Sequence, residues 1–183
     1  MKTALIIVAP GFEEIEAISV IDILRRAKVD VTIAGLDTLT TTGSHDISII
    51  ADSLFIDVSS SLYDVLILPG GEPGTTHLEN NSLVSDCIQH HIQNDKIVAA
   101  ICASPRILDK LGYLTSKDAT SHPSMKTRLT QCIYKEDRVV TTNQVITSRG
   151  PGTALEFALA ILTVLGLTKE SQELKESMLI QTQ

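Results

Sequence analysis

Residues 97–105, IVAAICASP, decide the fold of this chain. The five apolar residues from Ile97 to Ile101 predict a buried parallel strand, and Ser104-Pro105 begins a helical pattern that extends to Leu111. Cys102 is therefore expected at the elbow between a strand and a helix. In an α/β fold ligands bind at the carboxyl ends of strands, so this position favours a functional thiol over one that only fills space in the core.

The same strand-and-helix unit recurs along the chain. Apolar runs predict strands at residues 5–9, 31–35, 65–68, 97–101 and 145–148, and amphipathic stretches predict helices at 14–27, 81–93, 104–111, 153–165 and 169–179. Residues 38–52 are polar and β-prone, with a turn at Gly43-Ser44, which predicts a hairpin at one edge of the sheet. We expect an α/β fold with a mainly parallel sheet, helices on both faces, and a single domain over residues 1–183.

Composition and cysteine content limit the compartment and the partners. The chain has 183 residues, 43% of them hydrophobic, and a net charge of -7 without a basic run, which argues against nucleic acid and anionic membranes as partners. Three cysteines cannot all pair and none is spaced as CxxC, so neither a disulfide framework nor a zinc site is supported. The apolar run at residues 4–9 is too short for a signal peptide. We expect a cytoplasmic protein with a small-molecule or protein partner.

The carboxyl ends of the predicted parallel strands share one edge of the sheet, and four of them deliver residues that can carry chemistry. The first strand leads to residues 10–16 with three glutamates, the next to Gly70-Gly71, the third to Cys102, and the last to residues 149–152. His122, in a loop, could reach the same place. These segments together form the candidate site.

A thiol at the start of a helix lies near unpaired amides and the positive end of the helix dipole, so we expect the pKa of Cys102 to be depressed. The amides of Gly70, Gly71 and Ala103 could face an oxyanion beside this thiol, although diglycine also forms ordinary turns. A thiolate is both nucleophilic and oxidisable.

Glu16 is flanked by Ile15, Ala17 and Ile18, which are expected to face the core, so its carboxyl could point back toward the crevice. If it meets Cys102 it should be protonated and donate a hydrogen bond to the sulfur, because two anions in contact would raise each other's pKa. The alternative role for Glu16 is to complement the helix dipole.

His122 could move protons for Cys102, although a loop histidine is often merely solvated. His90 and His91 are adjacent in a predicted helix and point about 100° apart, so we expect no metal site there.

Four motifs occur in order along the chain: GFEEIE at residues 11–16, DVLILPGG at 64–71, AAICASP at 99–105 and TSRGPGT at 147–153. Together they resemble the ThiJ/PfpI superfamily, and within it the parkinsonism-associated deglycase branch often called DJ-one. The resemblance runs almost from end to end. It implies a flavodoxin-like three-layer α/β sandwich, usually a homodimer.

The resemblance also assigns roles to residues. The nucleophilic cysteine of the family corresponds to Cys102, the acid that is hydrogen-bonded to its sulfur to Glu16, the glycine-loop amides to Gly70 and Gly71, and the active-site histidine to His122. The activities proposed for the family are glutathione-independent conversion of methylglyoxal to lactate, removal of glyoxal adducts from proteins, oxidative-stress sensing and chaperone action.

Three departures from the family pattern matter. Members proposed as peptidases carry histidine directly after the cysteine, where this chain has Ala103, and amidotransferase relatives need a downstream His-x-Glu pair that is missing here. Ser104 stands where this branch often has glycine, which adds a hydroxyl near the nucleophile.

The leading hypothesis is a cofactor-free cysteine enzyme that acts on small reactive aldehydes, a glyoxalase, or on glycated proteins, a deglycase. The alternative is a redox sensor in which peroxide oxidises Cys102, or a redox-regulated chaperone, without turnover. A low thiol pKa would serve both chemistries, so the sequence leaves them open.

Overall fold

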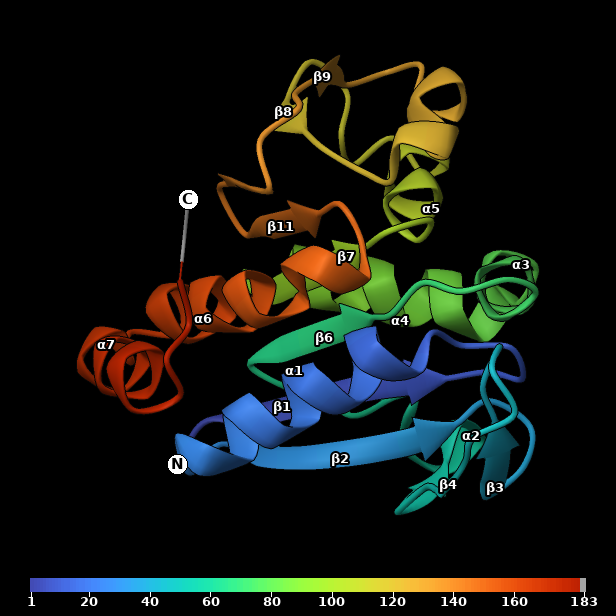
Figure 1. The fold of residues 1–183 in the computed structure, drawn as a ribbon. Helices are drawn as coiled ribbons and strands as arrows, with labels where there is room; N and C mark the ends of the chain where they lie inside the picture. Colours follow the sequence, from blue (N-terminus) through green and yellow to red (C-terminus); the bar gives the residue numbers. More distant parts are fainter. Residues whose placement is uncertain (182–183) are drawn as a thin grey trace.

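The computed structural model describes residues 1–181, and its centre is a seven-stranded sheet in the order β10-β11-β7-β6-β1-β2-β5 (Figure 1). All neighbouring strands in this sheet run parallel except β10 and β11. The five central strands β1, β2, β6, β7 and β11 therefore follow the flavodoxin-like order 2-1-3-4-5. The fold class expected from the sequence is confirmed, and the protein is a flavodoxin-like three-layer sandwich.

The bounds of the elements are as follows. The strands are β1 Thr3–Val8, β2 Asp30–Gly35, β3 Thr40–Thr42, β4 Ser48–Ile50, β5 Ser53–Leu54, β6 Val65–Leu68, β7 Ile97–Ile101, β8 Asp118–Ala119, β9 Ile133–Tyr134, β10 Val139–Thr142 and β11 Val145–Ser148. The helices are α1 Glu14–Arg26, α2 Phe55–Val58, α3 Gly74–Glu79, α4 Ser82–Gln93, α5 Pro105–Lys110, α6 Ala154–Val164 and α7 Thr168–Ser177, with short 3-10 turns at Pro123–Arg128 and Pro151–Thr153.

The alternation of side chains along β1 shows how the two cores form. Ala4, Ile6 and Val8 pack on one face of the sheet against α1 and α6, while Leu5 and Ile7 pack on the other face against α4 and α5. Each of these five residues is fully buried. A parallel sheet covered on both faces requires strands without a polar face, which is why the apolar runs identified the strands.

The strand order reverses direction between β1 and β6, and this point positions the site. In doubly wound sheets the loops that leave the two strands at such a switch point diverge to opposite faces and leave a crevice at the carboxyl edge. Here those loops are residues 9–13 after β1 and 69–72 after β6, and Cys102 directly follows β7, which lies next to β6.

Two predictions about the periphery need correction. The expected hairpin forms, with β3 antiparallel to β4. It is a separate two-stranded sheet that contacts the start of α1, and the strand at the edge of the main sheet is β5. Strand β10 was not expected, because its residues VVTT are only partly buried and carry a weak pattern. No helix formed by residues 1–181 has both the length and the apolar character that a membrane crossing needs.

Candidate active site

Cys102 lies directly after β7 in a left-handed backbone conformation, with φ of 64°. A residue other than glycine is strained in this region, and such strain persists where the surroundings fix the chain. Its amide donates to the carbonyl of Ser148 on β11 (3.0 Å), and its carbonyl accepts from the amide of His122 (2.9 Å). Neighbouring segments therefore hold both sides of the elbow.

Glu16 projects from the first turn of α1 and is fully buried. Its Oε2 accepts a hydrogen bond from the amide of Gly70 (2.8 Å), and its carboxyl also interacts with the side chain of Cys102. Its Oε1 has no hydrogen-bond partner among the described residues. The flanking residues differ from expectation: Ala17 is buried, but Ile15 and Ile18 are 55% and 43% exposed.

Burial raises the pKa of Glu16 from 4.5 to about 7, against the opposing effects of hydrogen bonds from Cys102 and Gly70. Removal of the carboxyl from water disfavours its charged form, and the hydrogen bond from the Gly70 amide, which favours the charged form, does not offset this effect. The expectation of a raised Glu16 pKa is therefore met.

The pKa of Cys102 shifts in the direction opposite to our expectation. Burial raises it, the negative charge of Glu16 and the hydrogen bond to that carboxylate raise it further, and the amides of Gly71 and Ala103 oppose this only in part. The sequence argument counted the helix amides and omitted the desolvation of the sulfur. A thiolate at Cys102 is therefore disfavoured as long as Glu16 is charged.

Neighbouring atoms leave no room for a side chain in the glycine loop at Gly70 and Gly71. A methyl group on Gly70 would lie 2.5 Å from Cys102 Cβ and 2.6 Å from Glu16 Oε2, so only glycine fits between these side chains. Gly71 has φ of 90°, where side chains other than hydrogen are strained. The Gly70 amide is already bound to Glu16, while the Gly71 and Ala103 amides point to the sulfur.

His122 lies on the exposed side of the same site. Its Nδ1 accepts from the Ser124 amide (3.3 Å) and contacts Ser124 Oγ (2.7 Å), which leaves Nε2 to carry the proton of a neutral ring. A methyl group on Gly150 would lie 3.5 Å from His122 Cδ2 and 4.0 Å from Glu16 Oε1. The ring and the buried carboxyl thus approach the same glycine.

The turn after β11 has one organising residue that the sequence did not single out. Thr153 Oγ1 accepts from the amides of Gly150 (3.0 Å) and Arg149 (3.2 Å) and contacts Ser148 Oγ (2.7 Å). A hydroxyl three residues after a glycine at the start of a helix was the available signal.

Ser104, the departure from the family pattern, does not line an open pocket. It is fully buried, its Oγ donates to the carbonyl of Pro69 (2.5 Å), and it also contacts Thr75 Oγ1 (3.3 Å). The extra hydroxyl ties the cysteine elbow to the glycine loop.

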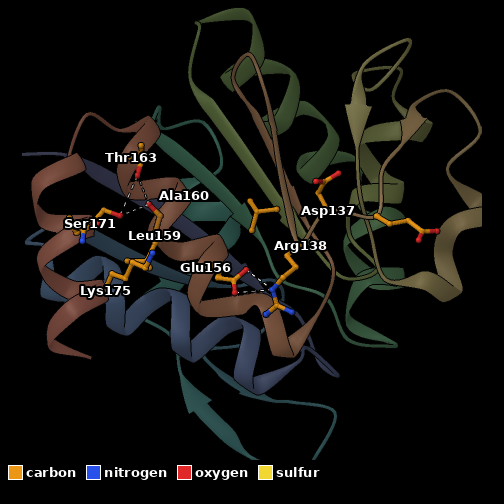
Figure 2. Close-up of a pocket in the computed structure, with 11 residues that line it drawn as sticks. Asp137, Arg138, Glu156, Leu159, Ala160, Thr163, Ser171 and Lys175 are labelled. Atoms are coloured by element: carbon orange, nitrogen blue, oxygen red, sulfur yellow. Dashed lines mark hydrogen bonds and ion pairs between the residues drawn. The ribbon is translucent and has the colours of Figure 1, made fainter. Parts of the chain in front are cut away.

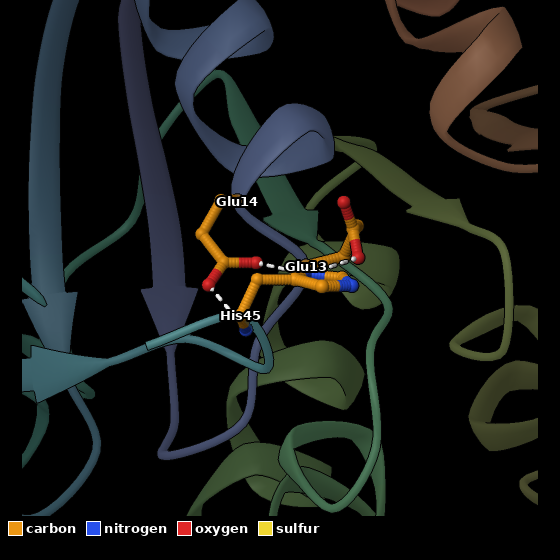
Figure 3. A group of neighbouring side chains, drawn as sticks. All are labelled: Glu13, Glu14 and His45. Carbon is orange, nitrogen blue, oxygen red and sulfur yellow. Dashed lines mark hydrogen bonds and ion pairs between the residues drawn. The ribbon is translucent and has the colours of Figure 1, made fainter. Parts of the chain in front are cut away.

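Glu13, Glu14 and His45 form a second cluster beside the site (Figure 3), one that the sequence did not indicate because His45 lies on the hairpin. Glu14 accepts from the amide (2.7 Å) and contacts Nδ1 (2.9 Å) of His45, and these bonds lower the pKa of Glu14 to about 2 despite its burial. The hydrogen bonds between Glu14 and His45 hold the hairpin against α1.

Cys87 and His91 also lie together on α4, but both His91 nitrogens are engaged, with the carbonyl of Cys87 (2.8 Å) and the amide of Tyr63 (3.2 Å). An open pocket of 570 Å³ lies beside α6 and α7 around the Arg138–Glu156 ion pair (Figure 2), and none of the candidate site residues lines it.

The chain is similar over nearly its whole length to proteins of a known family. The DJ-1/PfpI family model matches residues 2–164. Protein dj-1beta of Drosophila melanogaster is 42% identical over 182 residues, covering 98% of this chain and 97% of that protein. Its crystal structure aligns with a TM-score of 0.95 over 99% of each chain.

Two further relatives carry informative names. The glutathione-independent glyoxalase DJR-1.2 of Caenorhabditis elegans is 36% identical over 167 residues, covering 90% of this chain and 89% of that protein. A structure described as oxidised Toxoplasma gondii DJ-1 is 33% identical, covers 100% of both chains and has a TM-score of 0.95. With a family match and similarity that extend over nearly the whole chain, the protein belongs to the DJ-1/PfpI family.

Proposed function

We propose that the protein is a cysteine enzyme that converts small reactive aldehydes to hydroxy acids without glutathione, with methylglyoxal to lactate as the defining reaction. The observation that carries this proposal is the buried Glu16, with a pKa of about 7, in contact with Cys102. A proton acceptor with a pKa near the working pH is what general acid-base catalysis favours.

In the first step Cys102 Sγ bonds to the aldehyde carbon while its proton passes to the Glu16 carboxylate. The carbonyl π electrons move to the oxygen, which the Gly71 and Ala103 amides can stabilise before it is protonated to give a hemithioacetal. Transfer of the thiol proton during attack avoids the costly state in which both groups are charged.

In the second step the hydrogen on the former aldehyde carbon leaves as a proton, forming an enediol, and a proton is returned to the neighbouring carbon. Glu16, whose Oε1 is unpartnered, and His122 relay these protons. The product is a thioester, which water cleaves to lactate and the free thiol. The sum is methylglyoxal plus water to lactate, so the scheme requires no redox cofactor.

We propose deglycation as a second reaction for this site. An early methylglyoxal adduct on a protein amine or thiol is a carbinol at the former aldehyde carbon, and when Cys102 Sγ bonds to that carbon the side-chain amine or thiol leaves with a proton, which gives the same hemithioacetal. Cys102 is only partly buried and His122 is exposed, which supports access by adducts larger than methylglyoxal.

The test is lactate production from methylglyoxal without glutathione by wild type, Cys102→Ala and Glu16→Gln. We expect many turnovers for wild type, none for Cys102→Ala, and a loss of about 100-fold or more for Glu16→Gln, because general acid-base catalysis contributes about that much. Cys132→Ser is the matched control, since it removes a thiol outside the site. Consumption of one aldehyde per thiol by wild type would refute the enzyme proposal.

The second candidate function is a redox sensor. It is supported by the Gly71 and Ala103 amides and the protonatable Glu16 around the sulfur, which could stabilise an oxidised Cys102, and by the oxidised Toxoplasma relative. Absence of turnover together with selective oxidation of Cys102 by peroxide would favour it.

We also propose a homodimer and a cytoplasmic location. Ile15 and Ile18 on α1 are 55% and 43% exposed, and Ile47 on the hairpin, which contacts Glu14, is 55% exposed. Clustered exposed apolar side chains favour an interface, here with a second copy of the chain.

A further inference from the structure

Arg106 is a buried charge that the reaction scheme above does not use. Its side chain is 3% exposed, although it lies on α5 only four residues after Cys102. Burying a guanidinium is costly unless it is paired and hydrogen-bonded, so its partners indicate what it holds.

The partners belong to three different segments. Arg106 Nη1 pairs with Glu72, Nε donates to Glu79 Oε2 (3.2 Å), and Nη2 donates to Thr76 Oγ1 (2.9 Å). Nη1 also contacts Met125 Sδ (3.5 Å), three residues after His122. The fork of the guanidinium thus joins α5 to the glycine loop, to α3 and to the turn that follows His122.

Glu72 is the link to the chemistry, because it directly follows Gly71, whose amide points to Cys102 Sγ. One side of the loop is fixed to α1, where Gly70 donates to Glu16 and its carbonyl accepts from the Glu13 amide (2.9 Å). On its other side the loop is held by the Thr75 amide, which donates to the Gly71 carbonyl (2.8 Å), by Thr76 Oγ1, which donates to Glu72 Oε2 (2.8 Å), and by the pair of Arg106 with Glu72. Of these contacts, only the Arg106 pair comes from the helix that starts at the cysteine elbow.

We propose that Arg106 is a positioning residue that sets the Gly71 amide against Cys102 by holding Glu72. This inference rests on the proposed aldehyde chemistry only for its turnover measurement. A guanidinium is suited to the role because it bridges Glu72, Thr76 and Glu79 at once, which a lysine ammonium on one flexible stem cannot do with the same geometry.

A purely stabilising ion pair is the competing explanation, and substitution separates the two. Arg106→Met fills similar space but leaves Glu72 and Glu79 without their cation, which costs stability, so its rates are compared only for protein that circular dichroism shows to be folded. Arg106→Lys keeps the charge but loses the fork. Lys96→Gln is the matched control, since it removes the Lys96–Asp64 pair (2.9 Å) at the opposite end of the sheet.

Two rates are measured for folded protein: methylglyoxal turnover, and alkylation of Cys102 by iodoacetamide followed by mass spectrometry of the Cys102 peptide. We expect kcat to fall by about 10- to 100-fold in both Arg106 variants while KM changes by less than about twofold, because small misplacements near reacting atoms slow the chemical step. For the same reason we expect Cys102 to be alkylated about tenfold more slowly in both variants. Glu72→Gln should shift both rates in the same direction, and Lys96→Gln should leave them unchanged.

Wild-type rates in Arg106→Met would overturn the proposal, and so would wild-type rates in Arg106→Lys, because charge alone would then suffice. If wild type shows no turnover at all, the proposed function fails, and the alkylation rates still decide the role of Arg106.

Discussion

Cys102 and Glu16 titrate as a pair rather than as two independent groups. The pKa of about 7 for Glu16 and the raised pKa of Cys102 mean that the pair releases one proton near neutral pH and keeps the other on sulfur, because two adjacent buried anions are too costly. In the proposed reaction, the nucleophile is therefore made by moving a proton from Cys102 to Glu16 within one site. Solvent need not supply or remove that proton when the sulfur attacks.

Glu16 should reduce the stability of the fold at neutral pH. Its pKa is raised from 4.5 to about 7, so its contribution to stability is complete below about pH 4.5 and is lost as the pH rises to about 7. We expect Glu16→Gln to gain free energy of unfolding relative to wild type across this window, by up to about 3 kcal/mol. Urea unfolding at several pH values measures the difference.

Glu14→Gln provides the contrast, because the pKa of Glu14 is lowered to about 2. This carboxylate stabilises the fold above pH 4.5, and its contribution is lost as the pH falls toward 2. The two variants should therefore change stability with opposite signs at neutral pH. A pH-independent difference between Glu16→Gln and wild type would contradict the buried, protonatable Glu16.

Sequence reasoning identified the residues that follow strands and overlooked those whose partners are distant in sequence. Cys102 and Glu16 were found because strand ends point to the site. His45 and Arg106 were not found, because their carboxylate partners lie about 30 residues away. The pKa of Cys102 was misjudged because depth of burial is not visible in a local pattern.

At the scale of elements, the bounds of β6, β7 and β11 were predicted to the residue. β6 and β7 are apolar runs that end before a proline and a cysteine, and the β-branched run VIT of β11 ends two residues before an arginine. The hairpin was correct in type and wrong in placement, because pairing with a sheet edge depends on backbone partners far along the chain. The two-residue strands β8 and β9 carry no period that could be recognised.

Asp109 at the end of α5 organises the segment that follows the His122 loop. It is 1% exposed, and its carboxylate accepts from the amides of Thr130 (2.8 Å), Gln131 (3.2 Å) and Cys132 (3.1 Å). Asp109→Ala should cost about 2–4 kcal/mol in unfolding free energy, because several amides lose a charged acceptor.

Urea unfolding measures this cost, with Asp22→Ala as a control that breaks only an exposed ion pair to Arg26 and should be nearly neutral. A similar small effect in both variants would show that solvent replaces the Asp109 carboxylate at these amides.

At the scale of the whole molecule, the proposed homodimer is testable through α1. Ile18→Lys places a charge in the exposed apolar cluster and should convert the protein from twice 19.8 kDa to 19.8 kDa in light scattering. Leu179→Lys, at a position 85% exposed beyond α7, should leave the mass unchanged. A dimeric Ile18→Lys would place the interface elsewhere. A monomeric wild type would refute the homodimer.

The site draws its parts from both ends of the chain, with Glu16 on α1 and the turn at Arg149–Thr153 after β11. A chain that has not completed its sheet therefore carries Cys102 as an ordinary water-exposed thiol, with neither the buried carboxyl nor the surrounding amides. The reactivity of this one sulfur changes when the first and last thirds of the sequence meet. Pulsed alkylation during refolding, read at the Cys102 peptide, can thus time the completion of the fold without a fluorescent probe, in a protein that contains no tryptophan.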